Sequence, residues 1–562
     1  MRELTLRQAK TAIAGLVVLG PASLLSAADP ADGQRYLAAV RRFADVVIEK
    51  GRDTYGPEKT PLFVDGLHVE SFAPVRWNNK GQTWVLCNFA NQQALMRTLD
   101  GLTALTGESG YRQAAENAAR HALQRLVTPN GLLAWGGHLA WDLDGERAVG
   151  EGGPYTHELK TSQPYYELMW RVDPAATRRV LEAVWGGHVL DWALLDFNRH
   201  ADVRKPAVPR WDADFNESVD VPFPSVANNL SFVNVTPPLM HTGVMLGILG
   251  QSEPALKWTR RLVRRWQQGR DPKTGLCGGQ LSYRKDDRAH EALGHVHPEI
   301  NEAKIVASYH QTCRYHQLPL AQMQSGQDLL AAGGAHATLG HEFIQWACDD
   351  LKVYAQRCYD AEKGVFIARM TDGTAIRWQE SRKGYYVPES FAPQQPSGML
   401  LWSFATAYRL GNDRAHWRMA REMGRKLGLG DIGPPRGPRQ SALDTHLADV
   451  HALYGLLELH RATRDEALLK LACRVGDNLL ATQAPSGLFP RKGSVYARTG
   501  DEIPLVLLHL AGAVAGKTDT LPAPRLDHAF FHCVYDGELN EAQQKRDDAR
   551  TVDNLVFYNA RE

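Results

Sequence analysis

Hydrophobic residues recur at steps of three and four along almost the whole chain, which is the pattern of amphipathic helices. Many of these stretches end at a glycine or an asparagine, where a helix stops readily. Short polar loops such as 106–110 and 410–413 join neighbouring stretches, and such loops favour antiparallel helix pairs. The pattern predicts helices at 33–51, 88–107, 111–127, 175–195, 237–250, 253–269, 300–316, 340–360, 396–411, 414–428, 446–464 and 466–483.

Loops rich in glycine, proline and aromatic residues separate some of the helix pairs. They lie at 135–138, 223–238, 275–287, 383–398 and 486–498. Helical hairpins arranged in a ring, with functional loops at one mouth, explain this alternation of helix pairs and loops. An extended solenoid is the alternative, but it would show a fixed repeat length and the sequence has none. We therefore predict an all-α fold, an (α/α) toroid of helical hairpins with short irregular or β loops at the active-site mouth.

The N-terminal residues 1–28 have the pattern of a signal peptide. Basic residues precede an apolar run, and Ser26, Ala27 and Ala28 supply the small side chains that a signal peptidase accepts. A buried N-terminal helix is the alternative interpretation. The rest of the chain has no second apolar run long enough to cross a bilayer. We therefore predict a periplasmic or secreted protein without a membrane span.

No proline- or serine-rich linker follows residue 35, so residues 29–562 are predicted to form a single α/α-barrel domain. The charged tail at about 535–562 is compatible with a late helix and with partial disorder. Seven cysteines are scattered without any C-x-x-C pair, which excludes a disulfide scaffold and a zinc finger. The protein is expected to act as a monomer.

The charge balance is nearly neutral, with 63 acidic and 64 basic side chains. Nucleic-acid binding usually requires a strong basic footprint, so no nucleic-acid partner is expected. One dense basic stretch, 257–270, places arginines at 260, 261, 264 and 265 on one side of a predicted helix. This pattern fits a solvated helix face, and it also fits an electrostatic track for a polyanion.

Candidate metal ligands lie in three separate segments. His138 follows two glycines, Glu158 is expected near a helix start, and Arg199 and His200 are expected at the end of the helix at 175–195. Two imidazoles and one carboxylate form a recurrent metal site. Alternatively, both histidines are loop residues bonded to the backbone, and Arg199 caps the C-terminus of its helix.

Four stretches carry a resemblance to a known family: 84–107, 131–138, 157–170 and 183–200. Over residues 64–512 the chain resembles the family 2 polysaccharide lyases, which are mostly periplasmic pectate lyases. The resemblance is closest over residues 64–200 and thins through 201–390.

This resemblance implies an (α/α)7 barrel and a divalent ion held by His138, Glu158 and His200, with Arg199 as the base. It also implies an acidic polysaccharide as substrate. The predicted substrate contacts are Arg284, Trp135 and Lys160, although Arg284 could equally be an ordinary surface arginine. Nitrogen donors favour Mn²⁺, Co²⁺, Ni²⁺ or Zn²⁺ over Ca²⁺.

The predicted chemistry is β-elimination from a polyuronate such as pectate, which leaves a 4,5-unsaturated product. A divalent ion on the uronate carboxylate would lower the barrier to removal of the C5 proton. Arg199 can accept that proton only where its surroundings disfavour the cation, which predicts activity that rises toward alkaline pH.

Two other classes of function remain open from the sequence. A glycoside hydrolase on a similar toroid would use carboxylates such as Asp142, Asp144 or Glu158. A non-catalytic glycan-binding protein would stack sugars on the aromatic residues Trp77, Trp135 and Tyr165. The arginine beside His200 favours the lyase, because neither alternative requires it.

Overall fold

Helices make up most of the protein. The computed structural model describes residues 30–79, 82–150, 152–159, 161–226, 231–306, 316–376, 391–527 and 534–535. The helices are α1 Pro30–Lys50, α2 Gln93–Thr106, α3 Ser109–Arg125, α4 Tyr166–Val172, α5 Pro174–His188, α6 Thr236–Ile248, α7 Glu253–Gln268, α8 Arg288–Leu293, α9 Gln317–Ala332, α10 Gly334–Cys358, α11 Gly398–Gly411, α12 Arg414–Lys426, α13 Val450–Thr463, α14 Glu466–Leu480 and α15 Glu502–Val514.

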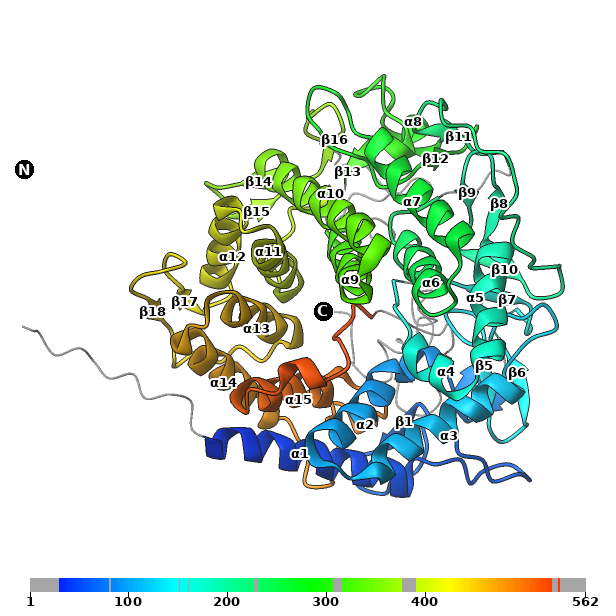
Figure 1. Ribbon diagram of the computed structural model, residues 1–562, viewed down its shortest axis with the longest axis vertical. Coiled ribbons are helices and arrows are strands. Elements are labelled where there is room, and N and C mark those ends of the chain that lie inside the picture. The colour runs from blue at the N-terminus through cyan, green and yellow to red at the C-terminus, as the bar shows by residue number, and fades with distance from the viewer. Residues whose placement is uncertain are drawn as a thin grey trace, which may run out of the picture.

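The helices pack in pairs of one inner and one outer helix and so form two concentric rings (Figure 1). The inner ring contains α2, α4, α6, α9, α11, α13 and α15. Within the described residues there are seven pairs: α2 with α3, α4 with α5, α6 with α7, α9 with α10, α11 with α12, α13 with α14, and α15 with α1. The last pair joins the first helix to the last one and so closes the ring. The predicted all-α toroid of helical hairpins is therefore confirmed.

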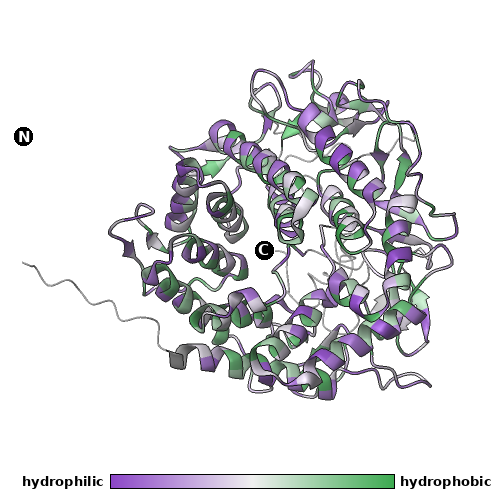
Figure 2. Cartoon of the chain, in the orientation of Figure 1, coloured by the Kyte–Doolittle hydropathy of each residue, from purple (hydrophilic) through white to green (hydrophobic). Residues whose placement is uncertain are grey.

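The outer helices are polar on their solvent side, whereas the inner helices are apolar around much of their circumference (Figure 2). One predicted helix is wrong. The segment 300–316 was expected to be helical, but it begins as the short 3-10 turn Glu302–Lys304 followed by a strand, and 307–315 lie outside the described residues. The helix is α9 instead. α9 is buried continuously from Gln317 to Gly326, but polar residues such as Gln322, Gln324 and Ser325 occupy some of these positions and interrupt the apolar spacing typical of a helix.

Short strands gather at one end of the ring. They are β1 Gly66–His68, β2 Trp77–Asn79, β3 Gln82–Trp84, β4 Leu86–Cys87, β5 Ala140–Asp142, β6 Arg147–Val149, β7 Thr156–Glu158, β8 Val189–Asp191, β9 Asp196–Phe197, β10 His200–Asp202, β11 Phe223–Pro224, β12 Ser282–Tyr283, β13 Ile305–Val306, β14 Tyr359–Asp360, β15 Val365–Phe366, β16 Arg369–Met370, β17 Gly430–Asp431, β18 Gln440–Ser441, β19 Tyr496–Arg498 and β20 Val534–Tyr535. All but β20 lie in connections that lead toward an inner helix, whereas the inner-to-outer connections are as short as Gly333 between α9 and α10. The predicted β loops at one mouth are therefore present.

The chain after α15 returns along the inside of the ring toward this mouth. The Leu526 backbone N–H donates to Gln324 of α9 at 3.2 Å, and Ser162 pairs with Asp527 in an isolated bridge. Arg525 is buried there and forms an ion pair with Asp328. This segment supports the loop that follows Glu158 from inside the ring.

Two further predictions concern the chain ends and the membrane. The predicted signal peptide, 1–28, and all but the first residue of the charged tail lie outside the described residues. Among the described helices, none is long and apolar enough to cross a membrane.

Candidate metal centre

The segment that carries His138 is held by a glycine and an asparagine. Gly136 has a φ of 106°, and a Cβ there would lie 2.7 Å from the Glu158 carbonyl oxygen. The Asn88 side chain accepts from the Gly136 N–H at 3.0 Å and donates to its carbonyl at 2.8 Å. Only glycine allows this close approach, which brings His138 against the strand that carries Glu158.

Glu158 and His200 lie directly opposite each other in the antiparallel pair formed by β7 and β10. Residues opposite each other in such a pair project from the same face of the sheet. The Leu159 N–H donates to the Arg199 carbonyl at 2.8 Å and extends the pairing by one residue. The expectation of a helix start at Glu158 is therefore wrong, because Glu158 ends a strand and α4 begins only at Tyr166.

The helix predicted at 175–195 is shorter than expected. It ends as α5 at His188, and the chain then forms the β8–β9 hairpin, with Leu195 in the left-handed region at a φ of 59°. Arg199 is therefore eleven residues beyond the helix end (199 − 188), and the C-terminal capping role considered for it is wrong. Apolar residues of the hairpin mimic a continuing helical period.

The three predicted ligands come together around a buried carboxylate. Nε2 of His138 lies 3.4 Å from Glu158 Oε2, and Nε2 of His200 lies 3.3 Å from Glu158 Oε1. One donor atom from each residue lies within 4.8 Å of the other two, and this is the one such cluster within the described part of the chain. The Glu158 side chain is 1% exposed, whereas the two imidazoles are partly exposed. Two nitrogens and one carboxylate oxygen fit a divalent transition-metal ion.

Arg199 lies beside the same carboxylate. Its Nε is 3.6 Å from Glu158 Oε1, and its guanidinium carbon is 5.8 Å from the ring centroid of Phe232. The side chain is 26% exposed, so it is accessible from the mouth. The predicted base and the predicted ligands therefore share one site.

Two histidines that the sequence reasoning missed lie behind this site. Nδ1 of His157 is 2.8 Å from Nε2 of His188, and Nδ1 of His188 is 2.8 Å from the Asn198 carbonyl oxygen. Burial lowers the pKa of His157 well below its ordinary value, and burial also lowers the pKa of His188 to about 4. One signal in the sequence was available: the tetrapeptide WGGH occurs at 135–138 and again at 185–188.

Trp135 does not have the exposed position that a sugar contact requires. Its side chain is 4% exposed, its ring stacks on Phe89 with centroids 6.0 Å apart, and its Nε1–H donates to His157 Nε2 at 3.1 Å. The prediction that Trp135 contacts the substrate is corrected accordingly, since no ring face is left for a sugar. Lys160, the other predicted contact in this segment, lies outside the described residues.

Arg284 follows β12, and a buried aspartate connects that strand to the segment that carries Arg199 and His200. Asp196 in β9 accepts hydrogen bonds from the hydroxyls of Ser282, Ser225 and Ser231, at 2.9, 2.7 and 2.8 Å. Because Asp196 lies three residues before Arg199, this cluster links the strand before Arg284 to the segment that carries the predicted base. Arg284 itself lines a surface hollow of about 650 Å³.

Most of the residues considered for the two alternative functions are buried in the protein. Asp142 is buried and accepts from the backbone N–H groups of Val85 and Asp144, at 3.1 and 3.3 Å, as a turn-forming residue does. Trp77 and Tyr165 are also buried, at 0% and 7% exposure. Asp144 is exposed, but Asp142 and Glu158 are buried, so these three carboxylates form no solvent-accessible pair, and the buried rings of Trp77 and Tyr165 offer no aromatic platform.

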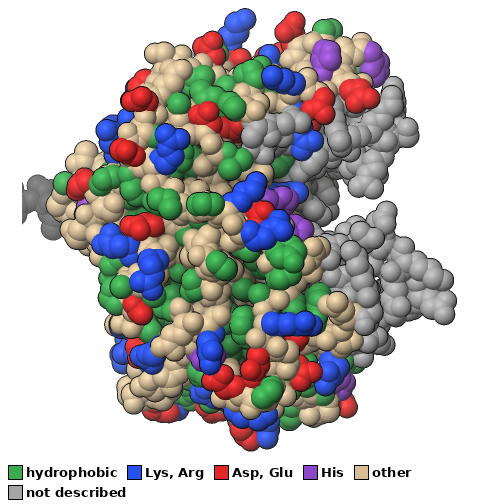
Figure 3. Space-filling model, turned by 90° about the vertical axis from the view of Figure 1, so that its right-hand side faces the viewer, with side chains coloured by type: hydrophobic (Ala, Val, Ile, Leu, Met, Phe, Trp, Pro, Cys, Tyr) green, Lys and Arg blue, Asp and Glu red, His purple; other side chains and the backbone are tan. Residues whose placement is uncertain are grey.

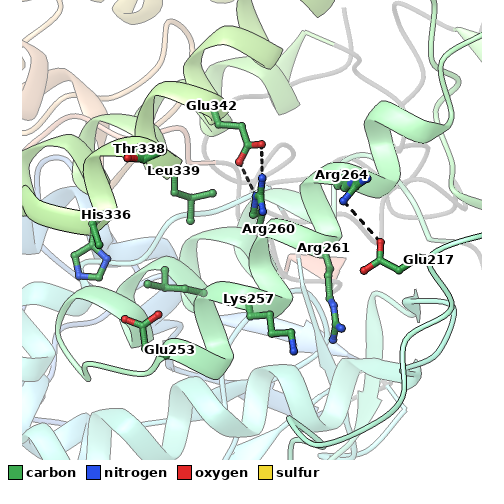
Figure 4. A pocket seen from close by; sticks show the side chains of 12 residues that line it. Glu217, Glu253, Lys257, Arg260, Arg261, Arg264, His336, Thr338, Leu339 and Glu342 are labelled. Atoms are coloured by element: carbon green, nitrogen blue, oxygen red, sulfur yellow. Dashed lines mark hydrogen bonds and ion pairs between the residues drawn. The ribbon is translucent and has the colours of Figure 1, made fainter.

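The basic stretch of α7 lies on the outer ring, where two of its arginines pair with acidic side chains. Arg260 donates to both carboxylate oxygens of Glu342 at 2.7 and 2.8 Å, and Arg264 lies 3.8 Å from Glu217 (Figure 4). Arg265 is fully buried and donates to backbone carbonyls, so it does not belong to the exposed face. Acidic and basic side chains are also intermixed on the face in Figure 3. A solvated, charge-balanced helix face therefore describes α7 better than a basic track.

The match to a family model identifies the relatives of this chain. The model described as periplasmic pectate lyase matches residues 60–534, which is most of the sequence. The chain belongs to the periplasmic pectate lyase family. A pectate disaccharide-lyase from Dickeya dadantii (strain 3937) is 27% identical over 530 residues, which cover 89% of this chain and 93% of that protein.

Solved structures give much weaker likenesses. A family 76 alpha-mannanase from Bacteroides thetaiotaomicron is 10% identical with a TM-score of 0.39, over 87% of this chain and 99% of that one. A cellobiose 2-epimerase from Bacillus thermoamylovorans is 9% identical with a TM-score of 0.41, over 86% and 100% of the two chains. Membership of the pectate lyase family therefore rests on the sequence match.

Proposed function

We propose that this protein is a polysaccharide lyase that cleaves pectate, or a related polyuronate, by metal-assisted β-elimination. One observation carries the proposal: Arg199 and two imidazoles surround the buried carboxylate of Glu158 at one accessible site. Membership of the periplasmic pectate lyase family supports the same reaction class.

His138, Glu158 and His200 would hold a divalent transition-metal ion. Such an ion, when bound, supplies a Lewis acid for the uronate carboxylate and so makes the C5 proton easier to remove. The glycine contact at residue 136 and the β7–β10 pair fix the backbone of the segments that carry the three donors. Constraints of this kind favour metal binding because they limit the reorganisation of the ligands.

Arg199 would accept the C5 proton of the bound uronate. Ordinary arginine is fully protonated, so this role needs a neighbouring positive charge, and a divalent ion held by the three ligands would supply one. The electron pair released at C5 then forms the C4–C5 double bond as the C4–oxygen bond breaks, and the departing oxygen takes a proton from solvent and becomes the hydroxyl of the new reducing end. Hydrolysis would instead need two accessible carboxyl groups on either side of the glycosidic bond. Glu158 is flanked by imidazoles and is almost completely buried, so it does not fit that arrangement.

We also propose that residues 1–28 are a signal peptide and that the mature chain, a single barrel, acts in the periplasm. Membership of the periplasmic pectate lyase family supports this location. Arg284 is proposed to bind a substrate carboxylate, and Mn²⁺, Co²⁺ or Ni²⁺ is proposed as the functional ion.

A panel of polyuronates tests the reaction class. The purified protein is stripped of metal, supplied with Mn²⁺, and incubated with polygalacturonate, alginate and a glucuronan. Ultraviolet absorbance of an unsaturated product is expected with polygalacturonate, and it should require the added ion. New reducing ends without this absorbance would contradict the proposal.

A further inference from the structure

A single line of hydrogen bonds runs behind the metal centre. It begins at the indole of Trp135, passes through the imidazoles of His157 and His188, and ends at the carbonyl oxygen of Asn198. The three separations are 3.1, 2.8 and 2.8 Å. Trp135, His157 and His188 are 4%, 1% and 0% exposed, so water does not compete for these bonds.

The chemistry of the groups gives this line a direction. An indole N–H can only donate, so Nε2 of His157 must accept. His157 then carries its proton on Nδ1 and donates to Nε2 of His188. His188 in turn carries its proton on Nδ1 and donates to the Asn198 carbonyl. Both rings are neutral in this arrangement, and each has one defined tautomer.

The line connects all three segments that carry the proposed site. Trp135 lies three residues before His138, His157 is adjacent to Glu158, and Asn198 directly precedes the pair formed by Arg199 and His200. His188 belongs to none of these segments, since it is the last residue of α5. The end of a rigid helix is therefore bonded to two of the three segments at once.

We propose that Trp135, His157 and His188 are positioning residues of the metal centre and that His188 locks the segments of Glu158 and Arg199 together. The proposal rests on the metal-assisted function proposed above. Groups that orient metal ligands from outside the coordination sphere contribute strongly to affinity, because the ligands are then held in place before binding. The neutral rings also add no positive charge next to a bound dication.

Substitutions at His188 test this proposal. His188→Leu removes both the acceptor for His157 and the donor for Asn198, whereas His188→Gln retains one acceptor and one donor. The dissociation constant for Mn²⁺ is measured by calorimetry on the metal-stripped mature chain, and the visible spectrum is recorded with Co²⁺. We expect His188→Leu to weaken Mn²⁺ binding by ~10–100-fold and to alter the Co²⁺ spectrum. His188→Gln should recover most of the affinity.

His416→Leu provides the matched control. His416 is another buried histidine with one bond to a backbone carbonyl, that of Cys348 at 3.0 Å, but it lies in α12, on a different hairpin. Its replacement should cost similar stability and leave Mn²⁺ affinity unchanged. Trp135→Phe keeps an aromatic ring but removes the first donor, so it should weaken binding less than His188→Leu.

Three results would overturn the positioning role. The first is a folded His188→Leu variant that binds Mn²⁺ as the wild type does, the second is an equal loss of affinity in His416→Leu, and the third is a His188→Gln variant no better than His188→Leu. Failure of the lyase proposal looks different. In that case the affinities would differ as expected while the wild type forms no unsaturated product from any polyuronate.

Discussion

Arg199→Lys separates a chemical role for this arginine from a merely electrostatic one. In the wild type, Arg199 Nε lies 3.6 Å from Glu158 Oε1. Lysine keeps the positive charge, so the attraction to Glu158 and much of the attraction to the substrate should persist. The ammonium group is compact and has no planar fork, so its nitrogen would occupy a different position relative to C5. Loss of a general base typically costs ~10²–10⁴-fold in rate, which corresponds to roughly 3–5 kcal/mol of transition-state stabilisation.

The structural cost of this substitution should be small. Arg199 is partly exposed, and exposed ion pairs contribute about 1 kcal/mol or less to stability. The assay is the initial rate of unsaturated-product formation at saturating Mn²⁺, with metal occupancy measured on the same sample. We expect kcat to fall by ~10²–10⁴-fold while metal stays bound and KM changes little.

Arg204→Lys is the matched control, because Arg204 lies just after β10, in the same segment as Arg199. Arg204 is 62% exposed and binds Asp202 through two hydrogen bonds of 2.9 and 2.8 Å. Its replacement should change turnover by less than about twofold, as expected for surface sites. A folded, metal-loaded Arg199→Lys variant with nearly normal turnover would refute the role of Arg199 as base.

Three other predictions follow from the same structure. Glu158→Gln or His138→Ala should leave the circular dichroism spectrum unchanged and weaken Mn²⁺ binding by more than the ~10–100-fold typical of residues that bond to the ligands without touching the metal. Loss of helicity in either variant would show that these residues have a structural role. Chelation should abolish activity, and Mn²⁺, Co²⁺ or Ni²⁺ should restore it better than Ca²⁺, whereas full activity with Ca²⁺ alone would count against the proposed ligands. Burial lowers the pKa of His509 from 6.5 to about 4, so its neutral form stabilises the fold above pH 6.5, and this contribution is lost as the pH falls toward 4. Urea unfolding of the wild type should show the free energy of unfolding falling by up to about 3 kcal/mol more than that of His509→Gln as the pH is lowered from 6.5 to 4. The same pH dependence in both proteins would contradict the assignment.

Most helices of both rings could be predicted from the sequence because their apolar residues recur at helical spacing. The segment 253–269 corresponds closely to α7, Glu253–Gln268. The inner helix α9 was missed because polar residues, Gln322, Gln324 and Ser325 among them, occupy buried positions and interrupt the apolar spacing. The stretch after His188 was wrongly extended as a helix, since the apolar residues of a tight hairpin can imitate a helical period over two turns.

The candidate ligands could be chosen from residue types and family resemblance, but their contact depends on pairing that local pattern does not encode. β7 and β10 are three residues long and are separated by the whole of α4 and α5. Strands this short carry no alternation that could reveal their register. The same limit applies to Trp135, whose burial against Phe89 and His157 is a long-range contact.

The fate of water in the reaction tests the central claim most directly. Polygalacturonate is cleaved by the Mn²⁺-loaded protein in water enriched in heavy oxygen, and the products are analysed by mass spectrometry. Elimination breaks the C4–oxygen bond without adding water, so we expect products that contain an unsaturated end and no more heavy oxygen than a reducing oligogalacturonate gains by exchange in a control without protein. Heavy oxygen at every new chain end, with no unsaturated product, would show hydrolysis and would contradict the proposed lyase.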